Sequence, residues 1–555
     1  MEKLRFIAIS GTTNVTQNMY LYEYTNSAGQ TEILIVDCGV GFPEEAIFGI
    51  DLVIPDFSYV VKNKDKVKGI LVSHGHEDHL GALPFLFQEL KAPIYATPLV
   101  AAFIEDKFGD YGQKEEVHVF NPDKDTLKIG SFTIDSFRVS HSVPDGVGFC
   151  ISTPLGNVFH VPDYKFDWTP VDQKPFDIAK AAVLAQNGVL ALASDALGST
   201  SEGYTKSESE IEQTIELVFE RANKRVYFTS LSSNISRMQQ AIRASERTGR
   251  KVALVGRSIE KKVEIARKLG LIKWSTGTVV SPREAQRLPR EKTTFIISGS
   301  YGQVGSALYR VALGEHPFLK IETDDTVVFS ADPAPPGTEQ AVNYIVDNLI
   351  ESGAVVHYYD TQDDLHVSGH GSQKDIELLF ALLKPKYLLP IGGTIRHMRA
   401  YSELAQNMGW KKTDVFELRA GETVEFTYEG VKKGDKVPVK SVLVDGLGVG
   451  DVGQVVLRDR QTLAKEGIVV VVLQIDKQAN SLITKPALLN RGFVFAQEQQ
   501  AFLDRSADEL DKQLKSRVKK LGAMEAKEVT VDFLERFFFA ETGRRPMVLP
   551  VVIEV

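Results

Sequence analysis

Cysteine is nearly absent from this sequence, in which only Cys38 and Cys150 occur among 555 residues. Two cysteines cannot build a disulfide framework, so a reducing compartment such as the cytoplasm fits best. Uninterrupted apolar runs are also short, because Ile468–Leu473 has only strand length and a membrane-spanning helix needs roughly 18 residues. The first residues, Met1–Phe6, lack the apolar stretch of a signal peptide. We therefore expect a cytoplasmic chain that does not span a membrane.

Positive charge is in deficit as well. The chain has 64 Lys and Arg residues against 73 Asp and Glu residues, which gives a net charge of −9. A protein that coats nucleic acid without sequence preference is usually basic, so bulk binding of this kind is disfavoured. A basic groove formed locally is still compatible with the composition.

The order of the expected elements predicts an α/β architecture with an insertion. Short β-rich runs such as Leu4–Ile9 and Phe132–Val139 alternate at first with loops and with helical stretches such as Leu83–Leu90. Regular alternation of helices and strands then begins with the helix Glu208–Asn223, which is typical of a parallel sheet. A late section has its own elements, among them the helix Thr530–Glu541. The expected segments are a first domain (1–205), an inserted domain (206–360), the completion of the first domain with a linker (361–448) and a C-terminal domain (449–555).

A histidine cluster directly follows the apolar strand Gly69–Val72. Three of the chain's 11 histidines fall within six residues, in a loop that contains His74, His76, Asp78 and His79. Imidazole and carboxylate groups suit zinc, and a catalytic zinc site leaves a position open for water. The pairs His74/His76 and Asp78/His79 can point to two metals about 3.5–4 Å apart, which together clamp a phosphate. A surface loop that is merely rich in histidine is the competing interpretation. We predict a metal-dependent hydrolase.

Two more ligand candidates follow strand ends. His141 lies in the segment Ser140–Asp145, and Asp163 follows the strand Val158–Val161. Each alone would usually be a residue of a turn or a core, but the histidine cluster makes both candidate ligands. We expect His160 to orient a ligand or a loop.

A glycine-rich segment, His366–Ser372, carries a different chemistry. Its backbone N–H groups, with Ser368 and Ser372, can cradle a phosphate. His370 can donate a proton to a developing oxyanion or to a leaving group. A tight turn with a buried histidine explains the same residues equally well.

These motifs resemble a known family. The His-x-His-x-Asp-His loop resembles that of the metallo-β-lactamase superfamily, and Ser194-Asp195, His366–Gly371 and Lys384–Tyr387 resemble its nucleic-acid-processing β-CASP branch. Within that branch the chain is similar to bacterial ribonuclease J along essentially its whole length. The resemblance implies a metallo-β-lactamase αββα sandwich with an inserted β-CASP α/β domain and a small C-terminal α/β domain.

The resemblance also implies a function. Ribonuclease J is a zinc-dependent ribonuclease that acts as an endonuclease and as a 5′→3′ exonuclease on single-stranded RNA, prefers a 5′-monophosphate end, and serves rRNA processing and mRNA decay. Homodimers or homotetramers assembled by the C-terminal domain, and partners in an RNA-decay complex, are expected on the same basis.

The resemblance further assigns roles to individual residues. The implied first metal site is His74, His76 and His141, the second is Asp78 and His79, and Asp163 bridges the two. The implied catalytic residues are Asp78, Asp195 and His370. The implied phosphate pocket is His366, Val367, Ser368, Gly369 and His370, and the implied RNA-contacting segment is Ser232–Arg237, with Ser233 and Asn234. A structural calcium is implied at Ile50, Asp51 and Asp445.

The chain departs from the family at the second metal site. The family normally has Pro-Val/Ile-His-Gly-Glu where this chain reads Pro-Ile-Gly-Gly-Thr, so Gly392 replaces the histidine that completes the site. The second metal can then bind with extra water, bind weakly or only with substrate, or recruit His397. Loss of a ligand commonly lowers metal affinity, since even groups that only orient ligands are worth roughly 10–100-fold.

Two loops depart as well: Ser10–Gln17 replaces a glycine-rich run, and Gly302–Val304 replaces Gly-Glu-Pro. Because these loops lie near the site in relatives, they bear on substrate preference. An active ribonuclease is the leading hypothesis. The alternatives are a weakly active paralogue that serves as a structural or regulatory subunit of an RNA-decay complex, and a β-CASP nuclease that acts on DNA.

Overall fold

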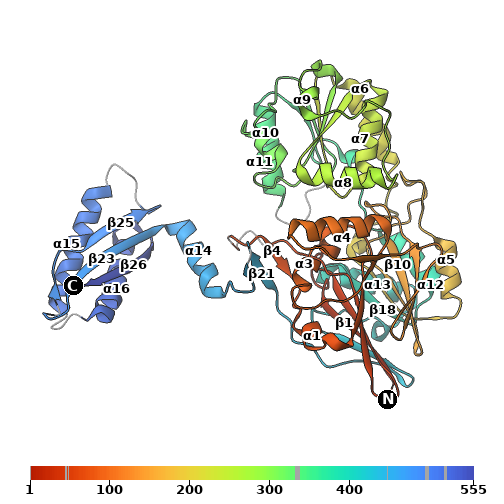
Figure 1. The fold of residues 1–555 in the computed structure, drawn as a ribbon, viewed down its shortest axis with the longest axis horizontal. Coiled ribbons are helices and arrows are strands. Elements are labelled where there is room, and N and C mark those ends of the chain that lie inside the picture. Colours follow the sequence, from red (N-terminus) through yellow and green to blue (C-terminus); the bar gives the residue numbers. More distant parts are fainter. Residues whose placement is uncertain are drawn as a thin grey trace. The chain divides into compact units, whose positions relative to one another are not determined.

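The computed structural model of the chain describes residues 2–43, 47, 49–331, 338–446, 448–479, 481–493, 499–517 and 522–555. Two compact units make up the chain, Met1–Phe42 with Val53–Val442, and Pro43–Leu52 with Leu443–Val555. Both units mix helices with sheets (Figure 1). Among the described residues, no helix has the length and apolar character needed to cross a membrane.

Two β-sheets enclose the main core of the first unit. The first sheet runs β20 (Gly430–Lys433), β19 (Thr423–Thr427), β1 (Lys3–Ser10), β2 (Met19–Thr25), β3 (Thr31–Val36), β5 (Val67–Leu71), β6 (Ile94–Ala96) and β7 (Val117–Val119). The second sheet runs β18 (Tyr387–Ile391), β12 (Val189–Asp195), β11 (Gly156–Val161), β10 (Val147–Thr153), β9 (Phe132–Arg138) and β8 (Thr126–Ile129). Buried side chains of both sheets, such as Phe6, Tyr22, Phe149 and Leu389, form one cluster, so the sheets pack on each other.

Helices cover the outer faces of these sheets. Against the second sheet lie α5 (Ile178–Ala185), α12 (Gln373–Leu383) and α13 (Ile395–Asn407), which share a second apolar cluster with it. Beside the first sheet lies α4 (Pro98–Asp110), which contacts β6 and β7, and α3 (Leu83–Leu86) packs on α4. Helices α1 (Ser58–Lys62) and α2 (Glu77–Leu80) belong to the same domain. The layering is therefore helix, sheet, sheet, helix, as predicted.

The inserted domain contains the predicted parallel sheet. Its order is β14 (Lys251–Val255), β15 (Thr293–Ile297), β13 (Val226–Thr229), β16 (Thr326–Phe329) and β17 (Val355–His357), and all pairs are parallel. Its helices are α6 (Glu210–Arg221), α7 (Ile235–Arg247), α8 (Arg257–Lys268), α9 (Pro282–Ala285), α10 (Ala307–Ala312) and α11 (Thr338–Glu351). Helices on both faces bury strands such as β13 completely, which explains their unbroken apolar sequences. Helix α8 lies against α4 of the first domain (Figure 1).

The second unit is built on a small sheet of its own. The long strand β23 (Ile468–Asp476) pairs in parallel with β26 (Met547–Glu554) and antiparallel with β25 (Ala487–Arg491) and β24 (Ser481–Leu482). The helices are α14 (Gln454–Glu466), α15 (Gln499–Arg517) and α16 (Ala523–Thr542). Short strands β4, β21 and β22 cover Leu52–Ile54, Val442–Asp445 and Gly448–Val449. Alternate residues of β23 are buried, as expected for a strand with one covered face.

Two helix predictions needed correction. The stretch Leu83–Leu90 is helical only to Leu86, and its remainder forms turns. Helix α16 begins at Ala523, well before the predicted Thr530. The sequence did not reveal this start, because the first turns of the helix are mostly exposed and show little apolar periodicity.

A buried ionic network ties the inserted domain to the first domain. Glu208, which is 2% exposed, lies 2.9 Å from the Nη2 atom of Arg237 and 3.4 Å from the Nζ atom of Lys165. Arg237 also donates to the carbonyl oxygens of Ser330 and Leu365. The network therefore joins the strand-end loop after β11, the start of α6 and helix α7.

The same network corrects one prediction from the sequence. Arg237 was predicted to belong to an RNA-contacting segment, but it is 0% exposed and its guanidinium is hydrogen-bonded to protein groups. Its role is to hold Glu208 and the residues before the glycine-rich loop. The sequence alone could not distinguish contact with RNA from pairing with Glu208, because a charged residue next to polar residues is ordinarily expected at the surface.

Replacing Arg237 with alanine should lower the free energy of unfolding strongly. The change leaves the carboxylate of Glu208 buried with only Lys165 near it, and breaking a buried pair of this kind costs roughly 3–5 kcal/mol. Denaturant unfolding followed by circular dichroism measures the loss. Arg225→Ala, which breaks a pair with the half-exposed Glu322, is the matched control and should cost less than about 1 kcal/mol. Equal losses would contradict the structural role.

Candidate metal centre

The predicted ligands lie in loops that follow strand ends. The loop His74–His79 follows β5, His141 follows β9, Asp163 follows β11, Asp195 ends β12 and Gly392 follows β18. Strands β11, β12 and β18 are parallel neighbours, so their carboxyl ends meet at one edge of the second sheet. The structure brings these separate segments to a single site.

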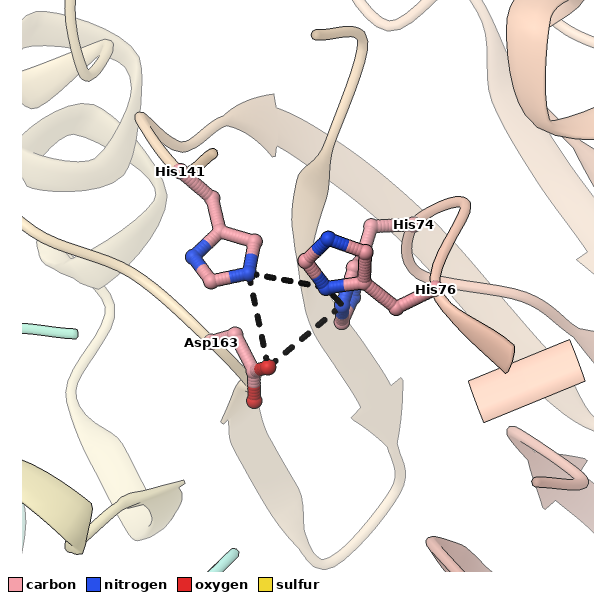
Figure 2. Close-up of side chains that lie close together, drawn as sticks. All are labelled: His74, His76, His141 and Asp163. Carbon is pink, nitrogen blue, oxygen red and sulfur yellow. Dashed lines mark hydrogen bonds and ion pairs between the residues drawn. The ribbon is translucent and has the colours of Figure 1, made fainter. Parts of the chain in front are cut away.

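Four side chains converge on one point, as Figure 2 shows. The Nδ1 atom of His76 lies 3.2 Å from Nε2 of His74 and 3.1 Å from Nε2 of His141. The Oδ2 atom of Asp163 lies 3.4 Å from Nε2 of His74 and 3.5 Å from Nε2 of His141. Ligand atoms around a tetrahedral zinc ion, at roughly 2.0–2.1 Å from it, are roughly 3.3–3.4 Å apart. The donor set therefore fits one zinc ion.

Hydrogen bonds turn the correct nitrogen of each imidazole toward that point. His141 holds its Nδ1 atom 2.7 Å from the carbonyl oxygen of Gly369, which can only accept, so the proton is on Nδ1 and Nε2 is free. His76 is turned the other way, with Nε2 3.1 Å from the hydroxyl of Ser142 and Nδ1 facing the cluster. Partners of this kind fix the tautomer and the ring orientation of a metal ligand.

Asp37 orients two further histidines and was missed in the sequence. Its buried carboxylate accepts hydrogen bonds from the backbone N–H and the hydroxyl of Ser73, both at 2.8 Å. Ser73 in turn lies 3.0 Å from Nδ1 of His74, and Nδ1 of His79 lies 2.8 Å from Asp37. The available signal was an aspartate directly after the apolar strand Thr31–Val36.

The electrostatic environment favours metal binding. Burial lowers the pKa of His76 and of His141 well below the ordinary value, so both imidazoles are neutral. Burial would raise the pKa of Asp163, but His79, His370 and His74 hold it well below the usual range. Neutral imidazole and ionised carboxylate are the forms in which these groups bind metal.

A second group of potential ligands adjoins the first. Nε2 of His79 lies 3.6 Å from Oδ2 of Asp78 and 3.5 Å from Oδ1 of Asp163. Asp163 thus presents one carboxylate oxygen to each group. The amide nitrogen of Asn18, however, lies 3.0 Å from Nε2 of His79 and 3.4 Å from Oδ2 of Asp78. The amide group of Asn18 therefore lies beside both potential ligands and donates to the carboxylate of Asp78.

No additional histidine completes this second group within the described residues. Gly392 has a φ of +67°, and a Cβ atom there would lie 3.3 Å from Oδ1 of Asp195. His397 is used elsewhere, because its Nδ1 atom accepts from the backbone N–H of Thr394 and caps helix α13. The possibility that His397 reaches the site is therefore contradicted.

His370 stands beside the metal ligands. Its Nδ1 atom lies 2.6 Å from Oδ2 of Asp195, and its Nε2 atom lies 3.9 Å from Oδ2 of Asp163. Burial would lower the pKa of His370, but Asp195 and Asp163 raise it to about 9. The ring is therefore an imidazolium whose Nε2–H faces the centre, where it can donate to an anion.

The rest of the glycine-rich loop divides between two roles. Ser368 is exposed, its hydroxyl accepts from the N–H of His370, and its carbonyl accepts from Lys165. Val367 is buried, and burial followed by the neighbouring Arg237 lowers the pKa of His366 to about 3. His370 is the loop side chain that lies beside the metal ligands, whereas the N–H groups of Gly371 and Ser372 donate to Tyr164 and to Thr205 and Asp375.

The other predicted residues are placed as follows. Ser233 and Asn234 are buried at the start of α7, and Oδ1 of Asn234 caps this helix by accepting from the N–H of Arg237. In the second unit, Oδ2 of Asp51 accepts from the N–H of Gly446, Asp445 pairs with Arg460, and Ile50 is buried. A guanidinium thus already stands beside Asp445, and calcium binding at this place stays a prediction.

Family models match most of the chain in four segments. Residues 12–166 match the metallo-beta-lactamase superfamily, and residues 223–349 match the beta-CASP domain of ribonuclease J. Residues 361–413 match the Zn-dependent metallo-hydrolase RNA specificity domain, and residues 455–555 match the ribonuclease J C-terminal domain.

Curated relatives match over the full length. Ribonuclease J2 of Bacillus subtilis (strain 168) is 37% identical, with 100% of this chain and 99% of the relative covered. Ribonuclease J 1 of Streptococcus pyogenes serotype M3 is 36% identical, covering 98% and 97%, and ribonuclease J of Thermus thermophilus is 35% identical, covering 100% and 96%. A solved structure of a protein of unknown function from Enterococcus faecalis V583 has a TM-score of 0.54 and 15% identity, covers 76% of this chain and 100% of its own, and shows likeness of fold alone.

Adding a methyl group at Gly369 should weaken metal binding. A Cβ atom there would lie 2.6 Å from Cε1 and 2.7 Å from Nδ1 of His141, so the imidazole must move. We expect Gly369→Ala to lower zinc affinity by about 10–100-fold, as loss of an orienting contact does. Competition with a chromogenic chelator measures the affinity. Gly109→Ala, where a Cβ atom meets nothing within 4 Å, is the control, and a similar loss there would refute the explanation.

Proposed function

This chain belongs to the ribonuclease J family, and we propose that, as a metal-dependent ribonuclease, it uses zinc held by His74, His76, His141 and Asp163. RNA is its substrate. We propose further that it cuts single-stranded RNA both internally and from the 5′ end, with preference for a 5′-monophosphate, in RNA maturation and decay. The tetrahedral spacing of the four ligand atoms carries the assignment of the site.

Each side chain has a part in the proposed reaction. A zinc ion held by His74, His76, His141 and Asp163 would have to take water as a further ligand; it would then lower the pKa of that water and polarise the phosphate oxygens. Asp163 presents its second oxygen toward Asp78 and His79, so it can span both groups of ligands. His370, oriented and kept protonated by Asp195, donates to a phosphate oxygen or to the departing hydroxyl group.

The glycine-rich loop is the proposed binding site of the terminal phosphate. Ser368 is exposed, and the hydrogen bond from the N–H of His370 to its hydroxyl orients that hydroxyl. Lys165 holds the carbonyl of Ser368 from the buried side, which keeps the loop in position. A loop fixed in this way can receive a terminal phosphate without first becoming ordered.

We propose one tightly bound metal and one weaker site. The first group has three imidazoles and a carboxylate, all oriented by neighbours. The second group has Asp78, His79 and a shared Asp163, lacks a ligand at Gly392, and has the amide of Asn18 against two of its members. A metal in the second group must displace that hydrogen bond, which lowers its net affinity.

Location and assembly are proposed on separate grounds. Cys38 and Cys150 are both free and buried, which supports a reducing cytoplasm. Strand β26 exposes Leu549, Val551 and Ile553 by 40–47%, an apolar row that supports a homodimer or homotetramer formed through the C-terminal domain. Partners in an RNA-decay complex belong to the same proposal.

The under-coordinated second group favours one other role. A chain with weak catalysis could serve mainly as a structural or regulatory subunit of an RNA-decay complex. Retention of the complete first group and of the His370–Asp195 pair supports catalysis instead. Action on DNA is the other alternative, and the same assay separates all three.

Purified zinc-loaded protein should degrade 5′-monophosphorylated single-stranded RNA faster than the 5′-triphosphorylated form, and should leave single-stranded DNA intact. His76→Ala should lower the rate by more than about 100-fold, since groups that merely orient a ligand already cost roughly 10–100-fold. His118→Ala changes an exposed histidine of β7 and serves as control. Intact RNA in the presence of bound zinc would favour the structural role, and cleavage of DNA alone would favour the DNA nuclease.

Metal analysis tests the proposed stoichiometry. Wild-type protein dialysed against a weak chelator should retain one zinc ion per chain. Asn18→Asp replaces the donating amide with a carboxylate ligand beside His79 and Asp78, so it should raise retention toward two. Gly392→His is a second route, although its φ of +67° strains any L-residue. Asn157→Asp, on strand β11, is the control. Two tightly held ions in the wild type would refute the proposal.

A further inference from the structure

A cleft of 620 Å³ lies between the first domain and helix α7 of the inserted domain. The loop residues Pro144 and Lys174 line it from the first domain, and Arg243, Lys273 and Trp274 line it from the inserted domain. None of these residues belongs to the metal centre. The volume is ample for a nucleotide.

Two elements of the chain bring the cleft close to the metal centre. One is the turn after β9, in which His141 and Ser142 face the centre while Pro144 lines the cleft. The other is helix α7, which starts after Asn234 and presents Ser236, Gln239 and Arg243 to the cleft at spacings of three and four residues. Pro144 of the cleft thus lies three residues after the potential metal ligand His141.

Contacts within the protein fix the indole ring of Trp274 on one side of this cleft. The guanidinium of Arg267 lies 4.2 Å from the centroid of its ring and covers one face. The backbone on both sides is clamped: Gln239 accepts from the N–H of Lys273 at 2.6 Å and donates to its carbonyl at 2.8 Å, and Glu246 accepts from the N–H of Ser275 at 2.6 Å. The indole therefore needs little further ordering to stack on a flat ligand.

The charged side chains that line the cleft near Trp274 favour binding of a phosphate. Lys174 and Lys273 are exposed at the cleft, and the charge of Lys174 interacts with the carboxylate of Asp172. Of the acidic residues that line the cleft, Glu246 is occupied by Ser275 and Thr278, and Asp172 accepts from the N–H of Lys174. Two exposed ammonium groups thus line the same cleft as the aromatic ring.

We propose that this cleft is a subsite for one nucleotide of the RNA strand, apart from the scissile bond. The base stacks on the open face of Trp274, opposite Arg267, and the phosphates pair with Lys174 and Lys273. Stacking of this kind tolerates any base, because every base has a flat face. The inference rests on the proposed ribonuclease function, and the subsite would favour long strands over short ones.

The test compares how tightly the full-length protein binds a short and a long RNA strand. Fluorescence anisotropy measures how the zinc-loaded protein binds 5′-monophosphorylated oligouridylates of about 4 and about 20 nucleotides, with phosphorothioate linkages that resist cleavage. Trp274→Ala should weaken binding of the long strand by about tenfold or more and leave the short strand unchanged. Trp274→Phe keeps a ring and should restore most of the affinity. Tyr428→Ala, at an exposed aromatic residue outside the cleft, should change neither.

Salt dependence provides an independent measurement. Each phosphate contact contributes about 0.7 to the slope of log affinity against log salt for a single strand. The double variant Lys174→Gln with Lys273→Gln should therefore flatten that slope by about 1.4 for the long strand only.

The possible failures are distinct. If the wild type binds and cleaves RNA, but Trp274→Ala binds the long strand as tightly as the wild type does, the subsite is overturned and the ribonuclease function stands. An equal loss for both lengths also overturns it, because the defect would then lie at the metal centre. If the wild type neither binds nor cleaves RNA, the proposed function itself falls.

Discussion

The candidate site depends first on the buried carboxylate of Asp37. It accepts the N–H and the hydroxyl of Ser73 and the Nδ1–H of His79, and so holds both ends of the histidine loop. Burial would raise the pKa of Asp37, but His79 and His74 keep it below its ordinary value, so the group stays charged. Without this anion, no hydrogen bond from Asp37 would orient Ser73 and His79, and the Nε2 atoms of His74 and His79 would not be held toward the centre. One residue outside the ligand set thereby determines the geometry of two potential ligands.

The two domains of the first unit are coupled through side chains rather than through a shared sheet. Glu208 lies between Lys165 of one domain and Arg237 of the other, and Lys165 also holds the carbonyl of Ser368. The loop that faces the metal centre is therefore anchored to the same network that fixes the inserted domain. Such buried pairs contribute little net stability relative to apolar packing, but they specify one arrangement because breaking them is costly. The geometry of the phosphate loop and the placement of α7 are thus linked.

The two potential metal sites differ although they share Asp163. The first is surrounded by groups that accept hydrogen bonds from its imidazoles, namely a carbonyl and hydroxyls, and these leave ligand nitrogens exposed to the centre. The second site has the amide of Asn18 beside Asp78 and His79, and Gly392 offers it no side-chain ligand. The difference arises from single side chains in loops far apart in the sequence, on an otherwise common framework.

Local patterns determined much of this protein from the sequence alone. The spacing of His74, His76, Asp78 and His79 after an apolar strand predicts a ligand loop, because strand ends in α/β sheets present polar residues at one edge. The regular alternation of helices and strands identified the parallel sheet of the inserted domain, because strands covered on both faces are apolar throughout. The matches to the metallo-beta-lactamase superfamily and to the beta-CASP domain of ribonuclease J agree with this domain content.

Other features were decided only by the tertiary structure. Whether Arg237 faces substrate or Glu208, whether His397 reaches the metal or caps its own helix, and what opposes His79 all depend on contacts between residues far apart in the chain. Residue type and spacing are the same in either case. The difference lies in burial and in hydrogen-bond partners, which exist only once the loops have been brought together.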